Sequence, residues 1–335
     1  MFNFINNVPV AVAMLIVMLL IINKFSGKLG DALHILGLKL KMPDSVRGAT
    51  LDAVASSFPE FATAMIAVFV GSFDEVGIPT IAGSGVFNVV IIPMASILAY
   101  KGSSKINIDK KGVMRSAVFY TLSLLLLLFF GLRSHYSLFG GLTLISLYII
   151  YVIYINTKTK KEKIVPENLK DVENSMSYFE IFLWTAAGIA AIWIGIDAVV
   201  KSVLVISDAI NVRPFIVSVI ILASATSIPD TILSVKSAKR GDMDGAVSNA
   251  VGSNIFNICM CLGLPMVIYY FINGENLPSD LSNNVGMIYF LIISMIITLI
   301  ILIKKSGIKR KDAHILIATY SVFILYIINL VVGIV

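Results

Sequence analysis

The chain has 335 residues, of which 58% are hydrophobic and 14% are charged, and its formal net charge is +6 at pH 7. A mean hydropathy of +0.92 excludes a soluble globular domain and predicts an all-α polytopic membrane protein. The positive charge is explained by basic residues in many short loops, so we expect contact with the lipid bilayer and no nucleic-acid partner.

Apolar stretches follow one another along the chain, each long enough, alone or with its neighbours, to cross the roughly 30 Å hydrocarbon layer as a helix. We expect ten transmembrane helices, near residues 8–40, 44–71, 76–100, 112–132, 135–157, 177–209, 213–238, 243–273, 284–303 and 312–335. The first 23 residues lack a basic leading region and a small-residue cleavage site, so they are assigned to the first span rather than to a signal peptide.

The basic residues predict the orientation of these helices. Of the 26 Lys and Arg residues, all except Arg133, Lys201 and Arg213 lie near the connections that follow the first, third, fifth, seventh and ninth spans. Lys and Arg next to a span are retained in the cytoplasm. We therefore expect an integral protein of a prokaryotic cell membrane with both termini on the extracytoplasmic side.

Two motifs occur twice in the same order. SSFPE at 56–60 matches TSIPD at 226–230, and GSGVFN at 83–88 matches GSNIFN at 252–257. We infer a first five-helix repeat at 1–157 with its motif region at 48–90, a cytoplasmic linker at 158–176, and a second repeat at 177–335 with its motif region at 218–260. An odd number of spans per repeat places the second repeat upside down relative to the first, as in many secondary transporters.

The duplicated proline motifs predict broken helices at the membrane midplane. Pro59 and Pro229 each lack an N–H group, which frees carbonyls one turn earlier, around Ala55 and Ala225. Hydroxyl and carboxylate side chains stand beside these carbonyls: Ser56, Ser57 and Glu60 in one copy, and Thr226, Ser227 and Asp230 in the other. Oxygen atoms of these three kinds are the ligands that hard cations prefer.

Simpler interpretations apply to each motif taken alone. A proline beside Ser or Thr is typical of a kink, and a glycine-rich motif is typical of close helix packing. Two acids facing each other inside the bilayer are very unfavourable without cations between them, so the duplication favours an ion site at Glu60 and Asp230. The second pair of motifs would add Ser84, Asn88, Ser253 and Asn257 as oxygen ligands.

The cysteines and histidines give no separate site. Cys259 and Cys261 are two residues apart on one helix and point to different sides, so they are interpreted as packing residues without a disulfide. The three histidines have no metal-ligand spacing.

The motif regions are similar to a known family. GATLDAVASSFPEFATAMIAVFVGSFDEVGIPTIAGSGVFNVV (48–90) and ASATSIPDTILSVKSAKRGDMDGAVSNAVGSNIFNI (223–258) resemble the two α-repeats of the cation/calcium exchanger superfamily. The second resembles most the potassium-dependent sodium/calcium exchanger branch. The resemblance implies an antiporter that exchanges Na⁺ for Ca²⁺ by alternating access. We expect no enzyme activity, no cofactor besides the transported ions, and no obligate protein partner.

The resemblance also implies a ligand set. Glu60 and Asp230 would be the central Ca²⁺ ligands, and Asn88 would complete the polar centre. The oxygen atoms that would serve Ca²⁺ and Na⁺ are the hydroxyls of Ser56, Ser57, Thr226, Ser227, Ser84 and Ser253, together with main-chain oxygens near Ala53 and Ala223.

Two positions depart from the family pattern. Asn257 stands where many members carry an acid that is associated with K⁺ requirement, so we expect K⁺-independent exchange. Asp52 stands where the family usually has an apolar or amide residue, about 12 Å before Glu60 if this stretch is helical. Two interpretations of Asp52 are open: it lines a cytoplasmic access path, or it is a solvated carboxylate in the cytoplasmic half of the helix.

Other functions remain open at this stage. A H⁺-coupled exchanger of Ca²⁺, or of another divalent cation such as Mg²⁺ or Mn²⁺, would use the same acids. An ion channel is disfavoured because two inverted copies in one chain do not line an axial pore. An intramembrane aspartyl protease is disfavoured because no GxGD motif occurs. The long first and sixth spans are the expected moving pair of the alternating-access cycle.

Overall fold

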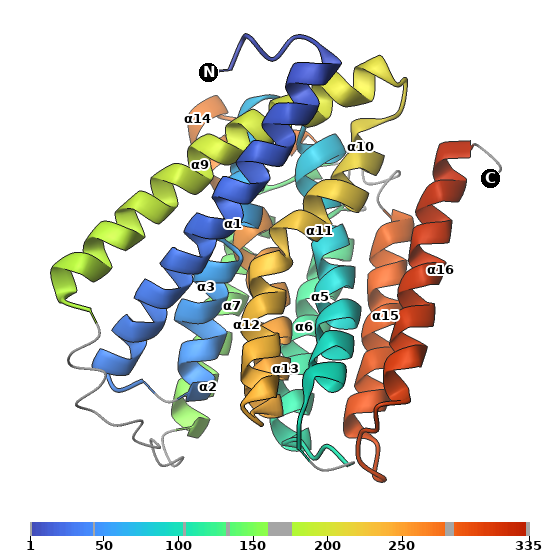
Figure 1. Cartoon of the computed structure of the whole chain (residues 1–335). Coiled ribbons are helices and arrows are strands. Elements are labelled where there is room, and N and C mark those ends of the chain that lie inside the picture. The colour runs from blue at the N-terminus through green and yellow to red at the C-terminus, as the bar shows by residue number, and fades with distance from the viewer. Residues whose placement is uncertain are drawn as a thin grey trace.

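The structure is a computed structural model that describes residues 2–42, 44–102, 105–131, 135–159, 176–278 and 285–332. Its architecture is helical, with two very short strands (Figure 1). Almost all of the predicted linker at 158–176 lies outside the described residues.

Seven helices of the first half are described, and two of them, α2 and α3, have only four residues each. Their bounds are α1 Val8–Lys39, α2 Asp44–Arg47, α3 Ala53–Ser56, α4 Phe58–Phe69, α5 Ile78–Ala99, α6 Lys110–Gly131 and α7 Leu138–Thr159. The second half contains α9 Tyr178–Ala209, α10 Pro214–Val217, α11 Ala223–Thr226, α12 Ile228–Lys239, α13 Met243–Phe256, α14 Gly263–Asn273, α15 Val285–Ile303 and α16 Asp312–Val332.

Four π-helical turns connect these helices: η1 Gly48–Asp52, η2 Phe73–Gly77, η3 Ser218–Leu222 and η4 Asn257–Leu262. Each π-turn continues directly into the α-helix that follows it, so the two belong to the same segment. Strands β1 His135–Tyr136 and β2 Leu277–Pro278 pair antiparallel and join the two halves.

The described residues contain nine helices long and apolar enough to cross a membrane, and ten if one bent pair is counted as a span. The bent pair is Gly48–Ser56 with Phe58–Phe69, whose axes differ by 55°. The prediction of a polytopic helical membrane fold is thereby confirmed, ten spans agree with the count in which the bent pair is one span, and the bend lies where SSFPE predicts a break. The corresponding segment of the second half, Pro214–Lys239, is interrupted at Ser227 but counts as a single span.

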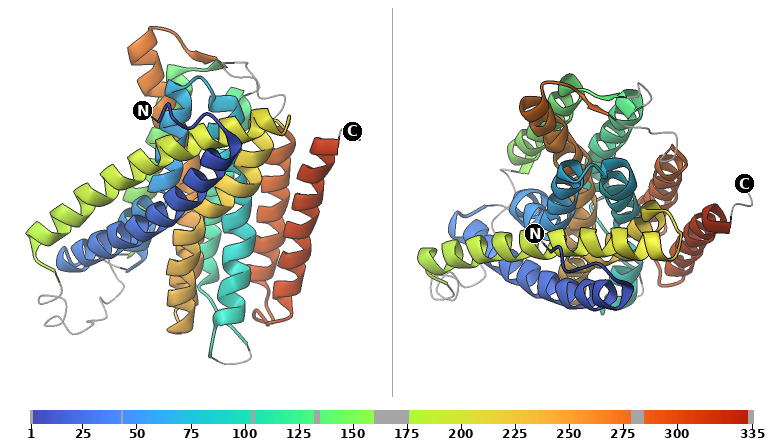
Figure 2. Two further views of the ribbon diagram at one scale, coloured as in Figure 1. Left: turned by 45° about the horizontal axis from the view of Figure 1, so that its top comes forward. Right: turned by 90° about the horizontal axis from the view of Figure 1, so that it is seen from above.

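Helices α1 and α9 form a pair that runs obliquely across one side of the bundle (Figures 1 and 2). Two glycines of α9 allow the close approach, because a Cβ at Gly188 would lie 3.0 Å from the Leu29 Cβ, and one at Gly195 would lie 2.8 Å from Ile22 Cγ1. Buried apolar residues of both helices form a cluster with residues of α4 that is separate from the main core. A capping box between Ser177 and Glu180 starts α9.

The main core is built around α5, against which α12, α13, α15 and α16 pack. The right-hand view of Figure 2 looks down onto this arrangement. Almost the whole first three turns of α5 are buried, which is consistent with the absence of a polar face in its sequence. The paired motif regions therefore lie inside the protein rather than against lipid.

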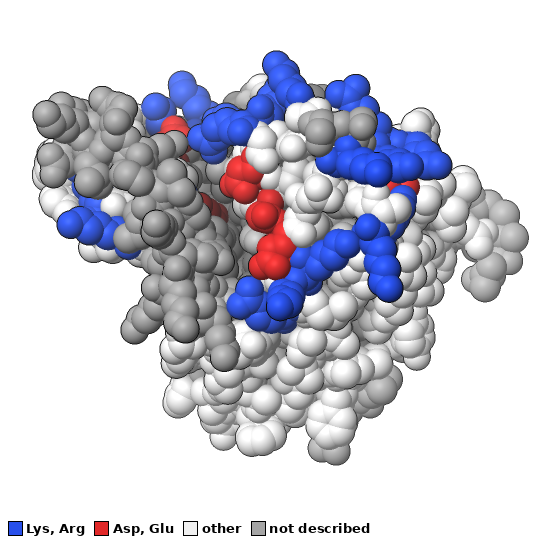
Figure 3. Space-filling model, turned by 90° about the horizontal axis from the view of Figure 1, so that it is seen from below, with Lys and Arg blue, Asp and Glu red and all other residues white. Residues whose placement is uncertain are grey.

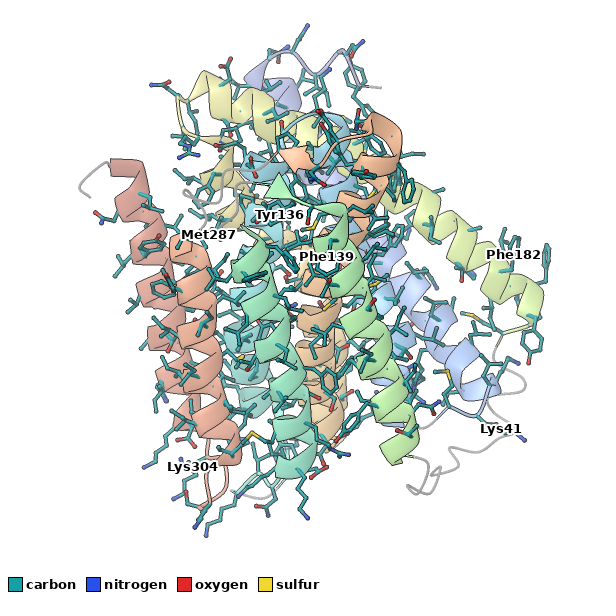
Figure 4. The ribbon with its side chains drawn as sticks, turned by 180° about the vertical axis from the view of Figure 1, so that it is seen from behind. Lys41, Tyr136, Phe139, Phe182, Met287 and Lys304 are labelled. Atoms are coloured by element: carbon teal, nitrogen blue, oxygen red, sulfur yellow. The ribbon has the colours of Figure 1, made fainter. Side chains whose placement is uncertain are left out.

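The two faces of the bundle differ in charge. Lys and Arg side chains gather on the lower face around a hollow that contains acidic side chains (Figure 3), and Lys41 and Lys304 lie at that end in Figure 4. The beginning of α1 and the end of α16 lie toward the opposite face (Figure 1). Phe139 and Phe182, labelled in Figure 4, are 71% and 68% exposed, as expected for lipid-facing side chains. The assignment of the basic face to the cytoplasm stays a prediction.

Candidate ion-binding site

Two helix interruptions place the acids at helix beginnings. Ser57 (φ −95°, ψ 8°) separates α3 from α4, and Ser227 (φ −82°, ψ −2°) separates α11 from α12. The prolines that follow occupy the first turn, where their missing N–H groups are not needed. Glu60 and Asp230 therefore lie in the first turns of α4 and α12, where the helix dipole favours negative charge, and both are fully buried.

Each carboxylate accepts a hydrogen bond from the serine of its own repeat's second motif. The Ser84 hydroxyl donates to Glu60 Oε1 at 3.0 Å, and the Ser253 hydroxyl donates to Asp230 Oδ1 at 2.8 Å. The equivalence of these contacts shows that α5 and α13 play matching roles in the two halves.

Further contacts cross from one repeat to the other. The Ser84 and Ser227 hydroxyls are 2.7 Å apart, and the Ser227 hydroxyl lies 3.5 Å from Glu60 Oε1. Asn88 Nδ2 donates to Asp230 Oδ2 at 3.3 Å, and Asn257 Nδ2 lies 3.5 Å from the Ser84 hydroxyl. Each acid thus accepts hydrogen bonds from side chains of both repeats in the centre of the protein.

Several oxygen atoms of this network have no hydrogen-bond partner. Within the described residues these are Glu60 Oε2, the Ser57 hydroxyl and Asn88 Oδ1, all fully buried. No ion pair of the described part of the chain involves Glu60 or Asp230. Buried polar atoms without partners are unfavourable, and a cation with oxygen preference would satisfy them.

The predicted main-chain ligands are already partly used. The Ala53 carbonyl accepts from the Ser57 N–H at 3.0 Å, and the Ala223 carbonyl accepts from the Ser227 N–H at 3.2 Å. The Ser56 and Thr226 hydroxyls also donate back to these carbonyls, at 3.3 and 3.2 Å. The ligand roles of these four residues stay predictions, although Ser56 also lies near Asp230 and Thr226 near Glu60.

Asp52 is held by two basic side chains in the basic half of the protein. It lies on η1 with 7% exposure, 3.2 Å from His34 Nδ1 of α1 and 3.5 Å from Arg47 Nε. It is therefore not the solvated carboxylate that one of the two interpretations describes. Its role in an access path stays a prediction.

The structure adds polar residues that the sequence interpretation missed. Asn249 Nδ2 donates to the Ser234 hydroxyl at 2.9 Å, and Asn254 Nδ2 donates to the Gly85 carbonyl at 3.0 Å. Asn249, Ser253 and Asn257 are four residues apart, which places them on one face of α13 and its extension. That spacing of polar residues in an apolar helix is a signal from which Asn249 could have been found.

The Cys261 thiol also belongs to the site's surroundings. Its sulfur lies 3.5 Å from Asn257 Oδ1 and 4.0 Å from the Ser57 carbonyl oxygen. The interpretation of this residue as a packing residue alone was incomplete, because a helix position does not reveal which neighbour it faces.

Comparison with known proteins gives the family. The profile described as "Sodium/calcium exchanger protein" matches residues 10–156 and 180–329, which is most of the chain. The sodium/potassium/calcium exchanger Nckx30C of Drosophila melanogaster is 36% identical over 127 residues, covering 38% of this chain and 14% of that protein. Sodium/potassium/calcium exchanger 4 of Mus musculus is 33% identical over 137 residues, covering 41% and 21%. The matches thus span only a small part of these relatives.

Solved structures share the fold. The H⁺/Ca²⁺ exchanger CAX superposes with a TM-score of 0.75 at 18% identity, covering 96% of this chain and 81% of that one. The sodium-calcium exchanger NCX_Mj superposes with a TM-score of 0.65 at 20% identity, covering 95% and 98%. The chain therefore belongs to the sodium/calcium exchanger family of the cation/calcium exchanger superfamily and is an integral membrane protein with that family's two-repeat fold.

Proposed function

We propose that the protein is a secondary active antiporter that exchanges Na⁺ for Ca²⁺ by alternating access, without a requirement for K⁺. One observation carries the proposal: Glu60 and Asp230 are fully buried, each accepts hydrogen bonds from side chains of both repeats, and oxygen atoms beside them have no partner within the described residues. Carboxylates together with neutral oxygen donors form a site for hard cations.

The same geometry explains obligatory exchange. Two bare carboxylates inside the bilayer are very unfavourable, so the empty site should not pass readily from one side to the other. Binding of Ca²⁺, or of several Na⁺ ions, neutralises the acids and permits the change of side. Because both kinds of ion use overlapping oxygen atoms, downhill movement of Na⁺ then drives Ca²⁺ the other way.

The second motif supports K⁺ independence. Where the resemblance associates an acid with K⁺ requirement, the neutral Asn257 directs its Nδ2 group at the Ser84 hydroxyl. Within the described residues no group of three or more Asp, Glu, His and Cys side chains forms a metal-binding cluster. The centre therefore provides the charge of two acids and no third.

The pair α1 and α9 is the proposed moving element. The two helices pack on each other along their length and lie across the bundle as a unit (Figure 2). The apolar cluster that they share with α4 is separate from the main core around α5. A slide of this pair would expose Glu60 and Asp230 to one side or the other while the core keeps its packing.

Proton coupling is the second candidate. Glu60 Oε2 lacks a hydrogen-bond partner among the described residues, and a proton could occupy this oxygen instead of Na⁺. In that case Ca²⁺, or another divalent cation such as Mg²⁺ or Mn²⁺, would exchange for H⁺.

The test is ⁴⁵Ca²⁺ uptake into proteoliposomes loaded with Na⁺, H⁺ or neither. We expect uptake driven by the Na⁺ gradient, unchanged by external K⁺, and abolished by Glu60→Gln or Asp230→Asn. Glu275→Gln is the matched control, because Glu275 is an exposed acid away from the motifs, and it should transport normally. Uptake that follows only the pH gradient would identify H⁺, and not Na⁺, as the coupling ion. Uptake and single-channel currents without any counter-ion gradient would refute exchange.

A further inference from the structure

The thiol of Cys261 lies at the edge of the ion site. Cys261 is fully buried in η4, one of the π-helical turns, which occur frequently at functional sites. Its sulfur faces two oxygen atoms from different repeats, Asn257 Oδ1 at 3.5 Å and the Ser57 carbonyl at 4.0 Å. Cys261 is also close enough to Glu60 and Asp230 to interact with both electrostatically.

The residue whose carbonyl oxygen lies near this sulfur also has an unsatisfied polar group. The Ser57 side chain is fully buried, and its hydroxyl has no hydrogen-bond partner within the described residues. Ser57 therefore presents a carbonyl near the sulfur and an unsatisfied hydroxyl from the same helix interruption. Glu60 Oε2, one turn further on, is likewise without a partner in that part of the structure.

The spacing suits a small divalent cation bound by sulfur and oxygen together. With metal–sulfur and metal–oxygen bonds of zinc length and tetrahedral angles, the sulfur and oxygen ligands stand about 3.6 Å apart. The two observed separations, 3.5 and 4.0 Å, are close to this value. Sulfur prefers thiophilic cations such as Zn²⁺ and Cd²⁺ to Ca²⁺.

Cys259 provides an internal comparison. It lies in the same turn and is equally buried, but within the described residues its sulfur makes no hydrogen bond to an oxygen atom of the ion site, whereas the Cys261 sulfur contacts two. The two thiols therefore differ in position and not in exposure.

We propose that Cys261 and Ser57, with Asn257 and Glu60, form a mixed sulfur and oxygen site that captures a thiophilic divalent cation and thereby inhibits exchange. The proposal rests on the proposed function in so far as the captured ion competes with Ca²⁺. On binding, the thiol loses its proton to water, and the resulting thiolate retains the metal. The residue thus sets which divalent cations inhibit the protein.

The test separates binding from transport. Purified protein is titrated with Cd²⁺, and the ultraviolet sulfur-to-Cd²⁺ charge-transfer band is recorded for the wild type, Cys261→Ser and Cys259→Ser. We expect the band in the wild type and in Cys259→Ser, and its loss in Cys261→Ser. In ⁴⁵Ca²⁺ uptake, the Zn²⁺ concentration for half inhibition should rise at least about 10-fold in Cys261→Ser and stay constant in Cys259→Ser.

The outcomes are distinguishable. A band that persists in Cys261→Ser, or is lost only in Cys259→Ser, overturns the proposal. A band without any ⁴⁵Ca²⁺ uptake supports the metal site and counts against the proposed function. Normal uptake without a band supports the proposed function and counts against the metal site. Should Cys261→Ser misfold, alkylation of the wild-type thiols with and without Zn²⁺ decides: protection of Cys261 supports the site, and equal labelling refutes it.

Discussion

The glycines of the duplicated GSG and GSN motifs differ in how closely the other repeat approaches them. A Cβ on Gly83 of α5 would lie 2.8 Å from the Ala223 Cβ and 3.1 Å from the Val219 carbonyl oxygen. A Cβ on Gly252 of α13 would meet nothing closer than the Ala49 Cα at 3.4 Å, an ordinary contact. The substitutions Gly83→Ala and Gly252→Ala therefore test the same chemistry in two environments.

The expected difference follows from two terms. Both variants gain the same helix propensity, about 1 kcal/mol per Gly→Ala change inside a helix, so this term cancels between them. Overpacking costs roughly 1–3 kcal/mol and applies only to Gly83→Ala, since its new methyl group contacts main-chain atoms that cannot rotate away. We expect Gly83→Ala to be less stable than Gly252→Ala by about that amount, a roughly 5–150-fold difference in the unfolding equilibrium constant.

The assay is chemical unfolding of both variants in mixed micelles, accompanied by ⁴⁵Ca²⁺ uptake. Because Gly83 precedes Ser84, which donates to Glu60, the displaced helix should also raise the Ca²⁺ concentration for half-maximal uptake. Gly252→Ala should leave both quantities near those of the wild type. Equal stabilities, or a larger loss in Gly252→Ala, would refute the packing argument.

Three further predictions concern the site and its access. Ser84→Ala removes a hydrogen bond to a buried carboxylate, so Ca²⁺ binding measured calorimetrically should weaken by about 1.5–3 kcal/mol. Ser96→Ala on the same helix is the control and should leave Ca²⁺ binding unchanged, because the Ser96 hydroxyl has no partner among the described residues. Asn257→Asp adds a third acid to the network, and uptake should become stimulated by K⁺; K⁺-insensitive uptake would contradict this. His34→Cys with Asp52→Cys, bridged by a short thiol reagent, should tie α1 to the core and stop exchange until the bridge is reduced; continued exchange would count against movement of α1.

The span pattern could be predicted because each span is long, apolar and bounded by basic loops. The apolar segment predicted at 44–71 corresponds to the bent pair Gly48–Ser56 and Phe58–Phe69, and the Pro59 motif indicated its interruption. The sequence could not provide the 55° change of axis there, because bend direction depends on which neighbours fill the space beside the freed backbone groups.

The two acids could be predicted because their motif is duplicated, which a packing explanation does not account for. The partner of each group could not be predicted in the same way. Asp52 pairs with His34, which lies 18 residues earlier in the chain on α1. Cys261 faces Ser57, which belongs to the other repeat. Contacts between distant segments depend on helix rotation, and a π-turn such as η4 changes that rotation without an evident mark in the sequence.

The two repeats are equivalent in some contacts and unequal in others, and this division has a physical meaning. The bonds from Ser84 to Glu60 and from Ser253 to Asp230 lie within each repeat and match. The crossing contacts do not match, since Asn88 donates to Asp230 while Asn257 reaches only Ser84.

The helix interruption is likewise strongly bent only in the first half. In an inverted-repeat transporter, a conformation open to one side must treat its two halves unequally, and the opposite conformation exchanges their roles. Under the proposed alternating-access mechanism, both conformations would keep the contacts within each repeat, and the crossing contacts would be remade when the site changes sides. An ion that neutralises Glu60 and Asp230 together would then make that exchange of partners possible within the bilayer.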